Sequence, residues 1–427
     1  MRKYMREEVL VFIVMVATIL VGAVVTRNRR EWSPFFLIVA SVLGSLVSGM
    51  GIRAREIVEG GFGFLDASLS VTAATVFVFL LYKGGAFHRI FQWIAGIGNR
   101  ALKSLLVLLF IAFPSSLTGF PFASLLTTGT IASSYMEKGG VKKEKITEIL
   151  VIGSFIGMVM PPSSLPAIIA SNGSGSVLPT PYNGFYLPLL AISLPLLLIY
   201  WLFNIKTLSS FEDKGKVGVE MVIAILVALA ALFDGVFGSL GYNGGNTLSF
   251  FLGSVAVIIV EKGYGSAVKC FNTVSDSLME AVVPVAFLFA LGSFIEISSM
   301  TGVRGLFSLR ILPYSVEGVM AFMMALSVVV GLFFSYPLPA FLISYAVFPI
   351  GWLANPVVVT GVSMALAVTT ILSLRSPLLD AASELTALDG KMKRKVFIPI
   401  LAISILSLAL GFFFLHFGDG FLWILNV

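Results

Sequence analysis

Residues 157 to 164 read Gly157-Met158-Val159-Met160-Pro161-Pro162-Ser163-Ser164, a double proline inside a long apolar run. Proline lacks a backbone N–H and its ring collides with the preceding turn, so this pair ends a helix and leaves carbonyl groups without helical partners. Within the hydrocarbon of a membrane, such a break is tolerated only where protein or a water-filled cavity surrounds it. Interrupted helices supply ion and substrate sites in secondary transporters, usually twice, in repeats of opposite orientation. The stretch therefore predicts a broken helix with a binding role.

The composition around this stretch is that of a polytopic helical membrane protein. Of the 427 residues, 58% are hydrophobic and 12% are charged, which gives many segments long enough to cross about 30 Å of hydrocarbon. The formal charge of +6 comes from Lys and Arg in short loops, where they set membrane orientation, so we expect a lipid bilayer and no nucleic acid as partner. One cysteine and two histidines exclude an internal disulfide and leave little for metal chemistry, so we expect no cofactor and no metal beyond a coupling ion.

Apolar segments of spanning length recur along the chain. The first, from Val9, lacks a small-residue cleavage site before Arg27 and is expected to be a retained helix. Spans are predicted at residues 9–26, 34–50, 64–82, 184–204, 217–236, 246–260, 281–299 and 396–417. Two amphipathic stretches, 86–103 and 266–280, are expected to lie in the membrane interface.

Between these spans the chain carries an internal repeat. Residues 104–136 and 316–350 are each interrupted by polar and proline-rich tips, which predicts a re-entrant helical hairpin in each. Each hairpin is followed by a broken helix, at 148–170 and at 357–385. We therefore predict four parts of the chain: N-terminal scaffold helices in 1–60, a first repeat in 61–204, connecting helices in 205–270, and a second repeat with the last helix in 271–427.

The loop charges predict that the two repeats are inverted. Residues 137–145 hold four lysines, whereas the corresponding residues 351–356 hold none. The loops after the broken helices reverse this pattern, because 171–184 is uncharged and 389–395 is basic. By the positive-inside rule the halves have opposite orientations, with 137–145 in the cytoplasm and both termini outside. The expected fold class is therefore an all-α multi-pass protein of the cytoplasmic membrane, with two inverted repeats.

These residues resemble the large membrane subunit of TRAP transporters, within the wider ion-transporter superfamily. The resemblance spans roughly residues 60 to 417 and rests on Phe113 to Gly119, Gly157 to Ser163, Gly331 to Ser335 and the break at Ser376-Pro377. It implies an elevator-type secondary transporter that moves a small organic anion, often a carboxylate, with sodium. It also implies two partners, a small membrane subunit and an extracytoplasmic substrate-binding protein.

The resemblance assigns site residues to both halves. The expected ion-binding residues, which combine hydroxyls with freed carbonyls, are Ser115, Ser116, Gly119, Gly157, Pro161 and Ser163. The expected substrate-binding residues are Thr118, Ser164, Ser335, Arg375 and Ser376. Phe120-Pro121 replaces a small Gly-Ser pair of the family, and Ser335 and Arg375-Ser376-Pro377 replace an aspartate and a Thr-Pro-Pro run. The second-half departures argue against a second sodium site.

Arg375 has two interpretations. A mid-span arginine costs several kcal/mol, so it must face a cavity or a partner. In the structural interpretation, Arg375 forms an ion pair with Asp380 or Glu384, or its side chain extends to a membrane interface. In the functional interpretation, its guanidinium, which suits a carboxylate, binds the substrate. In the second case its fixed charge would replace one sodium ion.

Other functions fit the sequence less well. An embedded enzyme would need a nucleophile with a base, a zinc motif or paired aspartates, and none is assembled. A channel filter is usually repeated by oligomer symmetry rather than by two inverted halves. We expect a secondary transporter and no enzyme, with a stand-alone carrier or proton coupling as the alternatives.

Overall fold

The protein is all-helical in the part of the chain that the structure describes. This computed structural model describes residues 2–25, 33–172, 186–211, 218–232, 245–260, 267–306, 356–372 and 376–424, with isolated positions between 313 and 329. Five helices are long and apolar enough to cross a membrane: Leu65–Lys83, Arg100–Thr118, Pro188–Leu208, Val268–Met300 and Gly390–Phe417. Three shorter apolar helices accompany them, at Pro34–Val47, Val219–Leu232 and Asn246–Val260. The predicted class of a polytopic helical membrane protein is confirmed.

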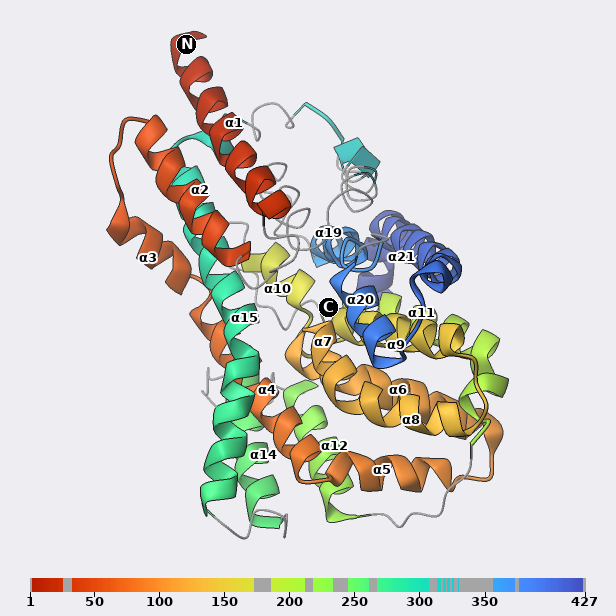
Figure 1. Ribbon diagram of the computed structural model, residues 1–427. Helices are drawn as coiled ribbons and strands as arrows, with labels where there is room; N and C mark the ends of the chain where they lie inside the picture. The colour runs from red at the N-terminus through yellow and green to blue at the C-terminus, as the bar shows by residue number, and fades with distance from the viewer. Residues whose placement is uncertain are drawn as a thin grey trace.

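One set of helices forms an elongated stack, which we call the scaffold group (Figure 1). Its members are α1 (Arg2–Val25), α2 (Ser33–Val47), α3 (Ala54–Phe62), α4 (Leu65–Lys83), α12 (Val219–Leu232), α14 (Gly245–Val260) and α15 (Ala267–Met300). The long α15 packs on α2, α3 and α4, and α14 packs on α4 and α12. Helices α3 and α15 cross closely because Gly60 and Gly292 have no side chains at the crossing. A Cβ on Gly292 would lie 2.1 Å from the carbonyl oxygen of Gly60.

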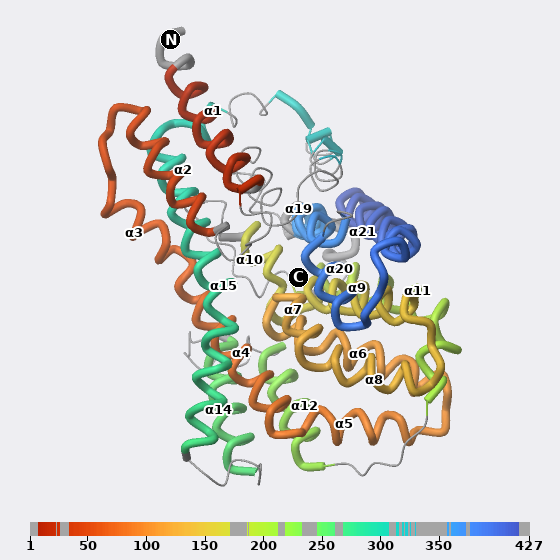
Figure 2. Tube along the Cα trace, in the orientation of Figure 1, coloured from red at the N-terminus to blue at the C-terminus, as the bar shows by residue number. Residues whose placement is uncertain are grey.

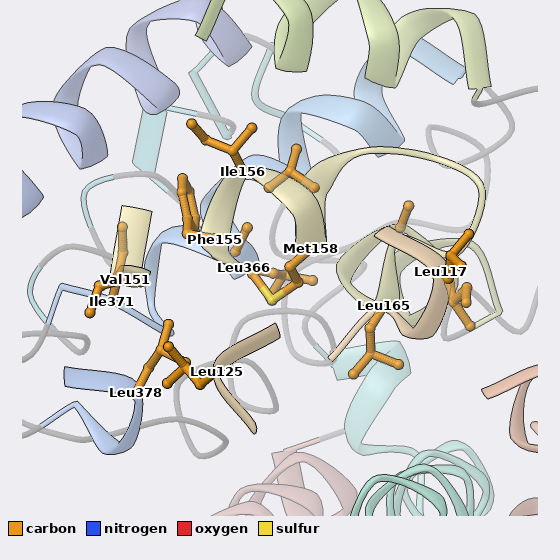
Figure 3. Close-up of a cluster of buried hydrophobic side chains, with 14 of the residues drawn as sticks. Leu117, Leu125, Val151, Phe155, Ile156, Met158, Leu165, Leu366, Ile371 and Leu378 are labelled. Atoms are coloured by element: carbon orange, nitrogen blue, oxygen red, sulfur yellow. The ribbon is translucent and has the colours of Figure 1, made fainter. Parts of the chain in front are cut away.

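The second set, the site group, lies beside the scaffold group (Figure 2). It comprises α6 (Arg100–Thr118), α7 (Pro121–Ser124), the π-helical turn η3 (Leu125–Gly129), α8 (Thr130–Lys138), α9 (Lys143–Val159), α10 (Leu165–Asn172), α11 (Tyr186–Leu208), α19 (Pro356–Val368), α20 (Pro377–Leu385) and α21 (Gly390–Ile424). Helix α6 packs on α9 and α11, and α21 packs on α9 and α19. The apolar core of this group includes Phe155, Leu165 and Leu366 (Figure 3).

Helix α5 (Ala86–Ala95) joins the two groups. Its Phe91 is fully buried, with its ring 4.8 Å from that of Tyr135 and 5.3 Å from that of Phe211. On another face of the helix, Arg89 pairs with Glu220 of α12 at 3.1 Å. The expected interfacial helix 86–103 is thus shorter than predicted, and its apolar face packs on protein.

The other amphipathic stretch, 266–280, is not a separate interfacial helix. Helix α15 runs from Ala267 to Met300 without a break, through Pro284. A proline in a membrane helix is tolerated where neighbouring groups satisfy the freed carbonyl. The prediction was wrong because a change from amphipathic to fully apolar sequence does not itself end a helix.

The first hairpin turns at Gly119. Helix α6 ends there because Gly119 adopts φ +68°, a left-handed conformation that favours glycine, and Pro121 then starts α7. Hydroxyl groups tie the two arms together around Pro114, which cannot donate a helical hydrogen bond. The Ser115 N–H donates to Ser124 Oγ at 2.9 Å, and Thr128 Oγ1 donates to the Ile111 carbonyl at 3.4 Å.

Two broken helices complete the site group. The first is α9 and α10 with residues 160–164 between them, and the second is α19 and α20 with residues 369–376 between them. Helix α10 packs on α19, and α20 packs on α9. Through this reciprocal packing, each half of one broken helix contacts a half of the other. The predicted second hairpin, 316–350, lies outside the described residues apart from isolated positions, so the inverted relation of the halves stays a prediction.

Candidate binding site at the helix breaks

The first break follows from the double proline. Helix α9 ends at Val159, and Met160 donates its N–H to the carbonyls of Ile156 and Gly157, each at 3.0 Å. Residues 161 and 162 have no N–H to offer to the carbonyls four positions earlier. The chain therefore leaves the helix at Met160 and bends through Pro161 and Pro162, which are joined by a cis peptide bond. Helix α10 begins at Leu165, and Ile168 donates its N–H to the Ser164 carbonyl at 2.9 Å.

The tip of the first hairpin lies directly on this break. A Cβ on Gly119 would lie 2.1 Å from the carbonyl oxygen of Ser163, so only glycine fits at this contact. Beside it, the Ser163 N–H donates to the Ser116 carbonyl at 3.1 Å. Backbone of the α6 terminus and backbone of the break are thus in direct contact.

A seam of small residues brings α9 equally close to α6. A Cβ on Gly157 would lie 2.1 Å from both the Ala112 carbonyl oxygen and Ser115 Oγ. One turn earlier, a Cβ on Gly153 would lie 2.8 Å from the Ile111 side chain. This is the small-xxx-small spacing that lets membrane helices approach backbone to backbone.

These contacts bring together Ser115, Ser116, Gly119, Gly157 and Ser163 of the expected ion-binding residues, and Thr118 of the expected substrate-binding residues lies beside them at the end of α6. Ser115, Ser116 and Thr118 are buried, and each hydroxyl donates to a carbonyl of its own helix at 2.8 to 2.9 Å. A hydroxyl that donates its proton keeps lone pairs that can accept or coordinate. Ser163 is 1% exposed, and its Oγ has no hydrogen-bond partner among the described residues. Ser164 is also fully buried.

The second break is described in part. Ser376 is fully buried, and its Oγ donates to the Thr370 carbonyl at 2.6 Å. Its own carbonyl accepts the Asp380 N–H at 2.9 Å and so begins α20. Asp380 Oδ1 accepts from Lys393 Nζ at 2.8 Å. Arg375 and Ser335 lie outside the described residues, so the pairing of Arg375 stays a prediction.

Sequence reasoning missed several residues next to the break. Asn246, the second residue of α14, donates from Nδ2 to the Pro162 carbonyl at 3.4 Å and to Tyr186 Oη at 3.0 Å. Ser124 holds the hairpin arms together. Asn246 follows a glycine-rich stretch that reads as an ordinary loop, and Ser124 lies in a run of small residues. Asn246 carries no local signal because its partners lie 84 and 60 residues away, and Ser124 carries none because its partner Ser115 lies across the hairpin turn, nine residues away.

Neither a protein-family model nor a curated protein matches the sequence. The solved structures with a similar fold include two transporters. One is the YdaH transporter of Alcanivorax borkumensis, with a TM-score of 0.61 and 11% identity, covering 86% of this chain and 88% of that chain. The other is MtrF of Neisseria gonorrhoeae, described with a class of antimetabolite efflux pumps, with a TM-score of 0.59 and 12% identity, covering 91% of this chain and 94% of that chain. Over nearly its whole length, the chain therefore has a fold found in membrane transporters.

Proposed function

We propose that this protein is a secondary active transporter that moves a small organic anion, such as a carboxylate, across the cytoplasmic membrane together with sodium. The observation that carries the proposal is the contact of the hairpin tip at Gly119 with the helix break at Ser163. Freed carbonyls and buried hydroxyls at a break in an apolar helix are the features by which secondary transporters bind ions. The shared fold with two transporters supports the same class.

The proposed sodium site lies at the first break. Hydroxyl and carbonyl oxygens are hard ligands suited to a small cation. Ser163 Oγ is buried and unpaired among the described residues, which suits a group awaiting such a ligand. Ser115 and Ser116 would contribute oxygens from the hairpin, while Gly119, Gly157 and Pro161 set the backbone path. Sodium is cargo in this scheme and not a resident cofactor.

The proposed anion site lies between the two breaks. Arg375 would bind a carboxylate through its guanidinium, with hydroxyls of Ser376, Thr118 and Ser164 around it. The support is positional, because Ser376 is fully buried and the helices that flank the two breaks pack on one another. Ser335 of the second hairpin is a further proposed ligand.

The proposed mechanism is an elevator movement of the site group against the scaffold group. The two groups are joined mainly through α4 and α5, so a sliding movement would disturb few helices. The chain covers 88% and 94% of two transporters, so the shared fold extends over nearly the whole of each, and both a stand-alone carrier and a TRAP-type subunit are compatible with it. Uptake by the purified chain alone would support the stand-alone form, whereas uptake that requires an added binding protein would support the TRAP-type partners.

The test is uptake of labelled organic anions into proteoliposomes under a sodium gradient or a potassium gradient. We expect sodium-dependent uptake, and Ser163→Ala should weaken the apparent sodium affinity about tenfold or more. Ser193→Ala is the matched control, because Ser193 is also fully buried and its hydroxyl has no partner in the described part of the chain, but it lies in α11. Uptake driven equally by potassium, or by a proton gradient alone, would overturn the sodium assignment.

Arg375 is tested in the same assay. We expect Arg375→Ala to abolish uptake and anion-induced thermal stabilisation, with little recovery in Arg375→Lys, because an ammonium does not offer the same two-pronged geometry. Arg55→Ala, at an exposed arginine paired with Glu59, serves as control. Normal anion stabilisation in Arg375→Ala would assign Arg375 to a structural ion pair.

A further inference from the structure

The helix break is also held from the scaffold side. Asn246 and Tyr186 are each 7% exposed, and the Asn246 amide donates to both the Pro162 carbonyl and the Tyr186 hydroxyl. Asn246 lies at the start of α14, whereas Pro162 lies between α9 and α10. The interaction therefore crosses from the scaffold group to the site group at the candidate site itself.

The Pro162 carbonyl needs this partner for a reason visible in the sequence. In a continuing helix it would accept the N–H of residue 166, but residue 166 is a proline and has no N–H. Pro162 is buried, where an unsatisfied carbonyl is costly and water is not freely available. The third proline of this segment thus leaves an acceptor within the site group that a donor on the scaffold satisfies.

We propose that Asn246 is a positioning residue that holds the helix break against the scaffold in one state of the transport cycle and releases it in the other. This inference rests on the proposed function. If the site group slides along the scaffold group, α14 cannot follow, because it is packed on α4 and α12. The Asn246 interaction then exists in one state only, and it weights the equilibrium toward that state.

A contact that stabilises one transport state can be distinguished from a residue that binds sodium directly. Losing the contact moves the population toward the other state without changing the intrinsic sodium affinity of either state. One hydrogen bond corresponds to about a fivefold change in that population ratio. If the two states start out similarly populated, the apparent sodium affinity should fall about threefold on one membrane face and rise by up to about twofold on the other.

The experiment compares sodium dependence of uptake from the two faces, using whole cells for the outer face and inside-out vesicles for the inner face. Asn246→Ala should shift the two affinities in opposite directions. Tyr186→Phe removes the nearer acceptor of the Asn246 amide and keeps the aromatic ring, so the site should stay folded. Because the amide keeps its Pro162 acceptor, the two sodium affinities should shift less than in Asn246→Ala. Asn204→Ala is the matched control, because Asn204 is also buried but donates to the Tyr200 carbonyl of its own helix.

The outcomes separate the two proposals. Wild-type protein without sodium-dependent uptake defeats the proposed function itself. With normal wild-type uptake, a weakening of equal size on both faces in Asn246→Ala overturns the inference and makes Asn246 part of the binding site. Unchanged affinities on both faces, with Asn204→Ala equally unaffected, would show that the interaction does not weight the states.

Discussion

Gly157 leaves no room for a side chain between α9 and α6. A methyl group there would lie 2.1 Å from the Ala112 carbonyl oxygen, and this backbone atom of α6 cannot move aside without disturbing the helix. We expect Gly157→Ala to destabilise the protein by about 1–3 kcal/mol through overpacking and to lower the unfolding temperature in detergent. Gly98→Ala, where a Cβ meets nothing within 4 Å, should leave that temperature unchanged. An equal effect at both positions would contradict the seam.

Ser124 stabilises the hairpin through one hydrogen bond. Its Oγ accepts the N–H of Ser115 at 2.9 Å, and both residues are fully buried. Ser124→Ala leaves that N–H without this acceptor, at a cost of about 1–3 kcal/mol. We expect faster hydrogen exchange at the Ser115 amide in Ser124→Ala than in wild type. Ser193→Ala removes a buried hydroxyl that has no partner within the described ranges, so the Ser115 amide should exchange there as in wild type.

The sequence could indicate a single residue only where its structural effect acts on residues close to it in the chain. Pro161 and Gly119 were found because a missing N–H and a turn act within a few residues of themselves. Their grouping with Ser115 and Ser163 came from the family resemblance. Asn246 was missed because its acceptor, Pro162, is 84 residues away. No pattern of neighbouring residues indicates a contact over such a separation.

At the scale of elements, the two broken helices are joined where α9 begins and α20 ends. Thr147 and Thr386 share a hydrogen bond of 2.7 Å between their hydroxyls, and both residues are buried. A double-mutant cycle of Thr147→Val and Thr386→Val should give a coupling free energy of about 0.5–1.5 kcal/mol by thermal or denaturant unfolding.

The control cycle pairs Thr147→Val with Thr75→Val. Thr75 is also buried, but its hydroxyl donates to the Val71 carbonyl within α4. We expect additive effects for that pair within about 0.5 kcal/mol. A coupling no larger for Thr147 with Thr386 than for Thr147 with Thr75 would show that the broken helices are not joined through these hydroxyls.

The elements themselves were largely predictable, whereas their limits and packing were not. Every predicted span overlaps a helix, since a segment of spanning length in a membrane has few alternatives to helix. The 266–280 stretch was misjudged because amphipathic sequence can continue into an apolar helix. The apolar face of α5 packs on Tyr135 and Phe211, and hydropathy cannot distinguish such a protein contact from lipid.

At the scale of the whole molecule, the loop charges predict which parts face the cytoplasm. In a Cys270→Ser background, Lys142→Cys should resist a membrane-impermeant thiol reagent in intact cells, because the lysine-rich loop is expected inside. Ser176→Cys, in the uncharged sequence 171–184 that the charge pattern predicts to lie outside, should react readily.

Permeabilised cells are the control for this labelling, because both cysteines should then react. The reverse pattern in intact cells would invert the predicted topology. Labelling of both cysteines in intact cells would contradict the assignment of the two loops to opposite sides, and with it the argument for inverted repeats.

The length of α15 bears on the membrane in which this protein works. Its 34 residues extend about 51 Å along the axis, against roughly 30 Å of hydrocarbon. Part of α15 must therefore lie outside the hydrocarbon. Asp276, in its first third, pairs with Lys83 at 3.8 Å and both side chains are exposed, so we expect that end of the helix to lie in the hydrated region. The rest must tilt or locally thicken the bilayer, each at a modest cost per ångström of mismatch. Lipid chain length would then set the tilt of α15. A thicker or thinner bilayer should therefore change the orientation of the scaffold group along which the site group is proposed to slide.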